Sequence, residues 1–523
     1  TLIPNFEPFP DTFHYITTAR CYITRGEWKL CRDGIQYELP GTVPSVPQAY
    51  SLALIPGFLV LNDPRFFYYT NVALSFIAII LFDSILKTLT KRKLLRATIL
   101  AILVTSYHVY WLPSLAMAEN LLIPLYLLAT WLLTKKVSRK QLVGLSIAAT
   151  GIYFTKYAYT PLTASIMLFG GITILVHTWN AQSLGKTLKS TLGLLPYLVG
   201  PAVILLPFSH NFSSSFSFLI SQLRISKPAE TAAASNSSYF SAKTSAAYLP
   251  EYFQVLLGKT ARFLWDFRPW YPKWIGYLGL GGWIAGLIQK KHRLLAGFLL
   301  VSTATQLAFM STFYAFDTRY IFSAFFAVLL GVALFVEPLL DHKTVTKLLT
   351  KIKLPVWVGT VAVVGVLGVI VLLPRATAVK SQIVINIKYA ETPWWYLSVL
   401  EYNSFFANKR EEQPQLITLS SPYLVDFFSN NTYAVLPFDE QQDFANVKDA
   451  VWGIENNTLL MDTYQQKLEN GETLYVADYG IQATDRFRST FAAYQERFTL
   501  TKVNSGCHDL CNIYSLELPV KRQ

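Results

Sequence analysis

The feature that most constrains the fold is a series of apolar runs, each of about 20 residues, repeated over the first three quarters of the chain. A run of that length can cross the ~30 Å hydrocarbon core of a bilayer as one helix. The composition agrees, because 52% of the 523 residues are hydrophobic and only 15% are charged. The sequence therefore predicts a polytopic α-helical membrane protein.

The basic residues explain the net charge of +13 and indicate the topology. They gather in short segments between apolar runs, within 87–96, 135–140, 186–189, 290–293 and 343–353. Loops rich in Lys and Arg face the cytoplasm by the positive-inside rule. We therefore interpret the positive charge as a topology signal, not as a surface for nucleic acid.

With these segments inside, the apolar runs predict about ten visible spans. Residues 44–61, bounded by prolines, are expected to form an interfacial or re-entrant helix. Because the sequence begins with Thr1 and not Met, we expect one more span ahead of it. The spans are expected near 66–89, 97–115, 120–135, 141–155, 159–178, 189–207, 274–290, 293–312, 319–338 and 356–374.

The spans divide the chain into three expected regions. Residues 1–65 form a first extracytoplasmic loop with interfacial helices, and 66–374 form the transmembrane bundle with an external loop at 208–273. Residues 375–523 form a C-terminal extracytoplasmic α/β domain, because short apolar runs alternate there with helical stretches. The expected strands are Leu416–Leu419, Ala434–Leu436, Leu459–Met461 and Leu474–Ala477, and the expected helices lie near 422–429, 440–452 and 482–496.

All four cysteines fall on the predicted outer side, and the spans contain none. In an oxidising compartment two local disulfides, Cys21–Cys31 and Cys507–Cys511, are expected. A zinc site made by all four is the alternative, although the pairs lack the usual close spacing.

Several ionisable residues share the outer level of the bundle in this topology. Asp11 precedes the bundle, Glu119 lies in a short outer turn, Lys156 follows at the next return, and Asp317 and Arg319 precede a later span. Each alone is explained by a helix cap, a snorkelling lysine or an arginine at lipid headgroups. Together they suit an anionic substrate and a proton transfer. Transfer of a sugar from a lipid phosphate needs both a base and cations for the departing phosphate.

Four short motifs carry a resemblance to a known family. The pattern Pro-Asp-x-x-x-Tyr-x-x-x-Ala over Pro10–Ala19 resembles the first outer loop of the GT-C membrane glycosyltransferases, in particular the aminoarabinose transferase and protein O-mannosyltransferase group. Ala118–Leu121 resembles their second acidic turn, with Asn120 in place of the usual proline. Thr155-Lys156 and Arg319-Tyr320 resemble their Thr-Lys and Arg-Tyr elements.

The resemblance implies a GT-C-like bundle and an integral-membrane glycosyltransferase. It implies transfer of a sugar from a polyprenyl-phosphate-linked donor to a lipid, glycan or protein acceptor, on the outer face of a prokaryotic plasma membrane. By motif, Asp11 is the catalytic base or a metal ligand and Glu119 its acidic partner, while Lys156 and Arg319 bind the donor phosphate.

Other residues are expected near the substrate. His14, Tyr15, Arg268 and Tyr320 are candidates for the wall of the substrate cavity. The resemblance leaves open whether Asp11 and Glu119 also hold a divalent metal, Mg²⁺ or Mn²⁺, because metal use varies across the superfamily.

Two other functions fit parts of the sequence. A transporter or flippase of lipid-linked sugars would share the bundle and the charges, but it would be expected to show internal repeats, and none is evident. A non-catalytic membrane anchor would leave the acids at Asp11 and Glu119 unexplained.

The topology predicts which positions an impermeant thiol reagent reaches. The segments 90–96, 134–140, 181–188, 290–293 and 341–355 lie in the cytoplasm, and residues 375–523 lie outside. In intact cells, a cysteine introduced by Asn470→Cys should be labelled from outside, whereas one introduced by Arg139→Cys should be protected. Labelling of position 139 without labelling of position 470 would overturn the topology.

Overall fold

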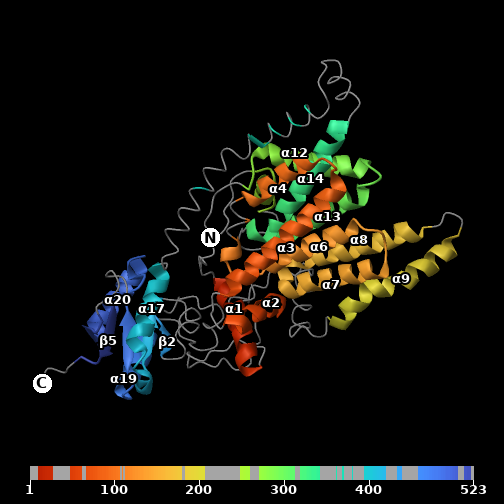
Figure 1. The fold of residues 1–523 in the computed structure, drawn as a ribbon. Coiled ribbons are helices and arrows are strands. Elements are labelled where there is room, and N and C mark those ends of the chain that lie inside the picture. Colours follow the sequence, from red (N-terminus) through yellow and green to blue (C-terminus); the bar gives the residue numbers. More distant parts are fainter. Residues whose placement is uncertain are drawn as a thin grey trace, which may run out of the picture. The chain divides into compact units, whose positions relative to one another are not determined.

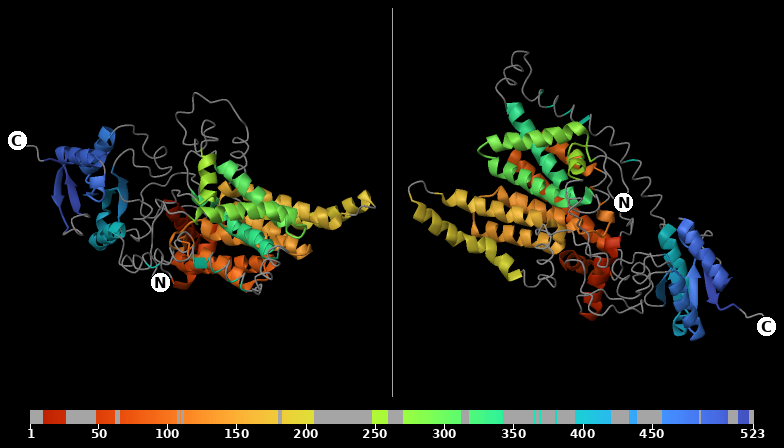
Figure 2. Two further views of the ribbon diagram at one scale, coloured as in Figure 1. Left: turned by 90° about the horizontal axis from the view of Figure 1, so that it is seen from above. Right: turned by 180° about the vertical axis from the view of Figure 1, so that it is seen from behind.

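The chain folds into two compact units, drawn in Figures 1 and 2 from a computed structural model. One unit comprises Val46–Val60 and Phe66–Val384, and the other comprises Thr1–Ser45, Leu61–Arg65 and Ile385–Gln523. The three regions expected from the sequence stay a prediction. The structure describes residues 10–26, 48–61, 66–106, 109, 112–179, 183–205, 248–258, 270–311, 318–341, 394–419, 433–438, 457–483, 485–504 and 512–519, and isolated positions between 358 and 380.

The larger unit is helical. Its long helices pack side by side, α3 on α6, α6 on α7, α7 on α8 and α9, α8 on α13, and α12 on α13 and α14 (Figures 1 and 2). Its elements are α2 (Gln48–Leu61), α3 (Phe66–Leu89), α4 (Lys93–Val104), η1 (Leu112–Ser114), α6 (Glu119–Leu133), α7 (Arg139–Thr155), η2 (Tyr157–Tyr159), α8 (Thr160–Thr178), α9 (Leu184–Leu205), α11 (Leu249–Leu256), α12 (Lys273–Ile288), α13 (Arg293–Met310), η4 (Thr318–Ile321) and α14 (Phe322–Asp341).

Within the described residues, five helical stretches are long and apolar enough to cross a bilayer. The protein is therefore an integral membrane protein with a mostly helical architecture. The total of about ten spans stays a prediction, because most of the segment expected at 356–374 lies outside the described residues. The five stretches are Tyr69–Leu89, Tyr157–Thr178, Leu184–Leu205, Arg293–Met310 and Thr318–Leu340.

The helix at the second expected span is shorter than the sequence suggested. We expected residues 97–115 to span the membrane, but α4 ends at Val104, and its 12 residues extend roughly 18 Å. The Ala101 carbonyl accepts the backbone N–H of Thr105, as in a continuing helix, and also the Thr105 hydroxyl at 2.6 Å. Thr105, Ser106 and His108 follow directly, so the sequence carried a polar break that the expected span ignored.

Because helices that follow one another in the chain run in opposite directions, their starts and ends gather at two opposite ends of the bundle. At the basic end, α3 and α14 finish together, and the Thr90 hydroxyl donates to Glu337 Oε2 at 2.5 Å. Asp83 is bridged there by Lys87 at 2.6 Å and by Arg96 at 3.0 Å. At the opposite end, hereafter the Glu119 end, α6, α8 and α14 begin while α7 and α13 finish.

Helices α12 and α14 approach each other closely because glycines face glycines. A Cβ atom on Gly282 would lie 1.7 Å from the Gly331 carbonyl oxygen, and one on Gly331 would lie 2.2 Å from the Gly279 oxygen. The indole N–H of Trp283 donates to the Ala327 carbonyl across the same interface at 3.0 Å. Backbone therefore packs directly on backbone, as is common where small residues line helix contacts in membranes.

The smaller unit contains α1 and an α/β sheet domain. The strand order is β2-β1-β3-β5-β4, with β1 parallel to both β2 and β3 and with β5 antiparallel to β3 and β4. This confirms a C-terminal sheet domain. Its elements are α1 (Pro10–Arg25), α17 (Trp394–Phe406), η5 (Arg410–Glu412), β1 (Gln415–Thr418), β2 (Ala434–Pro437), α19 (Asn457–Glu469), β3 (Leu474–Ala477), η7 (Ile481–Ala483), α20 (Asp485–Arg497), β4 (Thr499–Lys502) and β5 (Ile513–Glu517).

Side-chain alternation along β3 covers both faces of the sheet. Leu474 and Val476 enter the core shared with α19 and α20. Tyr475 points to the other face, where its ring meets Phe405 and Phe406 of α17 at 5.6 and 5.2 Å. The sheet is thus sandwiched between helices (Figure 1).

The strand expected at Leu459–Met461 is wrong, because these residues lie in α19. Leu460, Met461 and Tyr464 point from one face of that helix into the core. A short apolar run cannot by itself distinguish a buried strand from a turn of buried helix. The helices expected near 422–429 and 440–452 lie outside the described residues.

Cys21 of α1 is buried and disulfide-bonded. Cys31, Cys507 and Cys511 lie outside the described residues, so the pairing of the four cysteines stays a prediction.

The glycine contacts predict that one added methyl group lowers the stability of the bundle at Gly282 but not at Gly171. Gly282→Ala should destabilise the bundle by about 1–3 kcal/mol, because the new methyl meets backbone that cannot rotate away. Gly171→Ala in α8 is the matched control, since nothing lies within 4 Å of its Cβ position. Thermal unfolding in detergent measures both, and equal melting temperatures for the two variants would contradict the close contact.

Candidate functional site

The Glu119 end brings together three segments that are far apart in the sequence. They are the start of α6 with the turn before it, the short link between α7 and α8, and η4 at the start of α14. Glu119, Lys156 and Arg319, all singled out from the sequence, come from these three segments. Their positions are shown; their roles stay predictions.

The Glu119 carboxylate is completely buried at the first turn of α6. The Tyr159 hydroxyl donates to its Oε1 at 2.5 Å, and the Lys156 ammonium lies 3.9 Å from the same oxygen. Its Oε2 is buried and accepts no hydrogen bond from any residue that the structure describes. The helix N-terminus stabilises this negative charge.

Lys156 lies where α7 ends, and its side chain is 16% exposed. The C-terminal end of a helix dipole favours a cation at this position. Its ammonium is also 5.0 Å from the centroid of the Tyr320 ring, a distance that allows a cation–π interaction.

Arg319 is the second cation at the same aromatic ring. Its Nη2 donates to the Tyr320 hydroxyl at 3.0 Å, and its Cζ lies 4.8 Å from the ring centroid. Its Nη1 lies 3.8 Å from the sulfur of Met117, in the turn before Glu119. Two cations, Lys156 and Arg319, therefore lie at this ring.

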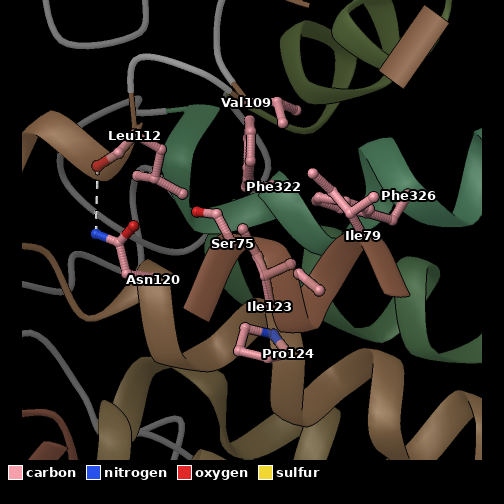
Figure 3. Close-up of a pocket in the computed structure, with 10 residues that line it drawn as sticks. Ser75, Ile79, Val109, Leu112, Asn120, Ile123, Pro124, Phe322 and Phe326 are labelled. Atoms are coloured by element: carbon pink, nitrogen blue, oxygen red, sulfur yellow. Dashed lines mark hydrogen bonds between the residues drawn. The ribbon is translucent and has the colours of Figure 1, made fainter. Parts of the chain in front are cut away.

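Two asparagines fix the turn that presents Glu119. The Asn120 amide nitrogen lies within 3.3 Å of the Leu112 carbonyl, as Figure 3 shows, 2.8 Å of the Leu115 carbonyl and 3.1 Å of the Met117 carbonyl. Asn71 donates to Leu115 as well, at 2.8 Å. Asn120, which replaces the proline of the family motif, thus holds the turn by hydrogen bonds instead of by a ring.

A small apolar cavity lies behind this turn, between α3, α6 and α14 (Figure 3). Its volume is about 20 Å³, which is room for roughly one water molecule and not for a lipid chain. The residues lining it are Ser75, Ala78, Ile79, Val109, Leu112, Asn120, Ile123, Pro124, Phe322 and Phe326.

Sequence reasoning missed two residues of the site. Gln306 of α13 donates to the Tyr320 carbonyl at 3.0 Å and to the Ala158 carbonyl at 3.4 Å, so it ties two of the three segments together. Its signal was the single amide side chain in its expected span, which is costly there unless bonded. Tyr159 carried no comparable signal, since buried tyrosines are common in this chain.

The remaining expected residues are only partly described. Asp11 and His14 belong to α1, but their side chains lie outside the described part of the chain, as do Arg268 and Asp317. Tyr15 of α1 is buried. Convergence of Asp11 with Glu119 therefore stays a prediction.

The described surroundings of Glu119 do not fit a divalent cation. Oε2 is one ligand atom, the Lys156 ammonium is close, and no cluster of three or more His, Cys, Asp or Glu side chains occurs among the described residues. A metal held jointly by Asp11 and Glu119 stays a prediction that depends on the side chain of Asp11.

Solved structures with the same architecture provide the comparison. The chain is similar to ArnT from Cupriavidus metallidurans bound to undecaprenyl phosphate, with a TM-score of 0.56 and 12% identity over 98% of this chain and 95% of that one. The apo state of ArnT gives 0.53 and 13% over 98% and 94%. The oligosaccharyltransferase of Archaeoglobus fulgidus in the apo form gives 0.55 and 11% over 100% and 72%.

These likenesses extend over nearly the whole chain. The chain has the GT-C glycosyltransferase fold. The resemblance inferred from four short motifs is confirmed at the level of fold. No known sequence family matches the chain, and no curated protein matches it in sequence.

The hydrogen bonds of Asn120 predict its contribution to stability. Asn120→Ala removes the donor for the turn carbonyls, leaves them buried and should cost about 1–3 kcal/mol. Thermal unfolding should show a melting temperature several degrees lower, while the exposed control Asn470→Ala should match wild type. An unchanged melting temperature for Asn120→Ala would show that the turn before α6 keeps its conformation without the hydrogen bonds of Asn120.

Proposed function

We propose that this protein is a glycosyltransferase that moves a sugar from a polyprenyl-phosphate-linked donor to a lipid, glycan or protein acceptor. The reaction takes place at the Glu119 end of the bundle, on the extracytoplasmic face of a prokaryotic plasma membrane. The C-terminal α/β domain lies on that same side.

One observation carries the proposal: the Lys156 and Arg319 cations both lie within 5.0 Å of the centroid of the Tyr320 ring, and Lys156 lies beside the buried Glu119 carboxylate. Two cations at one aromatic ring are suited to a phosphate at the membrane surface. A solved protein of the same fold, ArnT, was crystallised with undecaprenyl phosphate. That ligand supports the same class of donor for this chain.

The proposed reaction breaks the bond between the anomeric carbon and the phosphate oxygen, and it forms a bond from that carbon to the acceptor. Asp11 takes the proton that the acceptor loses. The bonding electrons leave with the polyprenyl phosphate, whose added negative charge is stabilised by Lys156 and Arg319. Glu119 is the acidic partner that lies next to Lys156. His14, Tyr15, Arg268 and Tyr320 surround the substrate in this proposal.

Substitution of Asp11 tests most directly whether its carboxylate is the catalytic base. Asp11→Asn keeps the size of the side chain but removes the base, so transfer should fall roughly 100-fold or more. The donor is first identified by mass spectrometry of lipid that co-purifies with the protein, and transfer from it is then measured in nanodiscs. Asp485→Asn, at a side chain that is 98% exposed, is the matched control and should keep full activity. Near wild-type transfer by intact Asp11→Asn would remove Asp11 from catalysis.

Lys156→Ala forms the second arm of that experiment. It weakens both donor binding and leaving-group stabilisation, so added donor should offset part of its defect. Movement of the lipid between leaflets without any sugar transfer would instead favour the flippase.

A further inference from the structure

Two donors lie at different distances from the same oxygen of Glu119, Oε1. The Tyr159 hydroxyl lies at 2.5 Å from Oε1, whereas the Lys156 ammonium lies at 3.9 Å. A direct charge-assisted bond between an ammonium and a carboxylate has a length of about 2.7–2.9 Å. The lysine is therefore about 1 Å beyond close pairing with the carboxylate.

Tyr159 is well placed to maintain this separation. It is completely buried in η2, and the neighbouring Ala158 carbonyl accepts a bond from Gln306 of α13. The Tyr159 backbone N–H donates to the Lys156 carbonyl at 3.0 Å, so the two residues belong to one short turn. The hydroxyl is thus held at Oε1 by its own backbone.

We propose that Tyr159 is a positioning residue that keeps the Glu119 carboxylate from closing on the Lys156 ammonium, and so sets the affinity of the site for the phosphate of the donor lipid. This rests on the proposed function. Without the hydroxyl, Oε1 loses its bond from Tyr159 and pairs with Lys156 at hydrogen-bonding distance. The carboxylate then competes with the phosphate for the same ammonium.

The proposal predicts opposite effects for two conservative changes. Tyr159→Phe removes only the hydroxyl and should weaken binding of a lipid phosphate. Glu119→Gln removes the competing charge but keeps an oxygen for Tyr159, so it should not weaken binding. In Tyr159→Phe with Glu119→Gln, the Glu119 carboxylate that would capture Lys156 is gone, and binding should be restored. A role in packing alone predicts instead that the double variant binds no better than Tyr159→Phe.

The experiment measures binding of undecaprenyl phosphate to the full chain in nanodiscs, with the uncharged undecaprenol as reference lipid. Wild type should prefer the phosphate. Tyr159→Phe should bind it roughly 10-fold more weakly or worse, which is the lower range for loss of a hydrogen bond to a charged group. Tyr126→Phe is the matched control, because it removes an equally buried hydroxyl that contacts the neutral Ser302 at 3.3 Å, and its binding should equal that of wild type.

The outcomes separate this inference from the proposed function. If wild type shows no preference for the phosphate, both are overturned. If wild type prefers it and Tyr159→Phe binds equally well, or the double variant stays as weak as Tyr159→Phe, the positioning role is overturned and the function stands. If Tyr159→Phe does not fold, Glu119→Gln decides: binding at least as tight as wild type supports the role, and weaker binding overturns it.

Discussion

Burial of the Glu119 carboxylate is the constraint on which the arrangement of the site depends. An ionised carboxylate taken out of water is very costly unless it is paired and hydrogen-bonded. Here the compensation comes from the N-terminus of α6, the Tyr159 hydroxyl and the nearby Lys156. Since these groups belong to separate helices, α6, α7 and α8 must meet at one level. Tyr320 then joins the start of α14 to the same point.

Much of this end of the bundle could be predicted from the sequence, because apolar runs and basic loops fix helix direction. Once direction is known, Glu119, Lys156 and Arg319 must fall at the same end. Their partners could not be predicted. Which tyrosine reaches Oε1 depends on the turn of η2, and which carbonyls Gln306 bonds depends on how α13 packs. Neither leaves a pattern in the sequence.

In the α/β domain too, the sequence pattern predicted some elements, whereas others depend on packing that the pattern does not reveal. The strands β1, β2 and β3 were predicted because they are buried on both faces and read as short apolar runs. The edge strand β4 was missed, since Thr499–Lys502 is largely exposed and polar. The run Leu459–Met461 was misassigned because α19 is amphipathic and presents a strand-length apolar patch to the core.

The position of Arg319 depends on contacts that contain no charge. Arg319 lies in η4, immediately before α14, and α14 is locked against α12 where Gly282 faces Gly331. At the start of α14, Phe322 packs edge-on against Trp270 at 5.9 Å. Backbone contacts of this kind resist sliding, because any shift brings atoms already in contact into overlap. A rigid α14 therefore holds Arg319 and its neighbour Tyr320 at a fixed height, while Lys156 approaches from the α7–α8 link. The apolar interior of the bundle thus sets the positions of Lys156, Arg319 and the Glu119 carboxylate at its end.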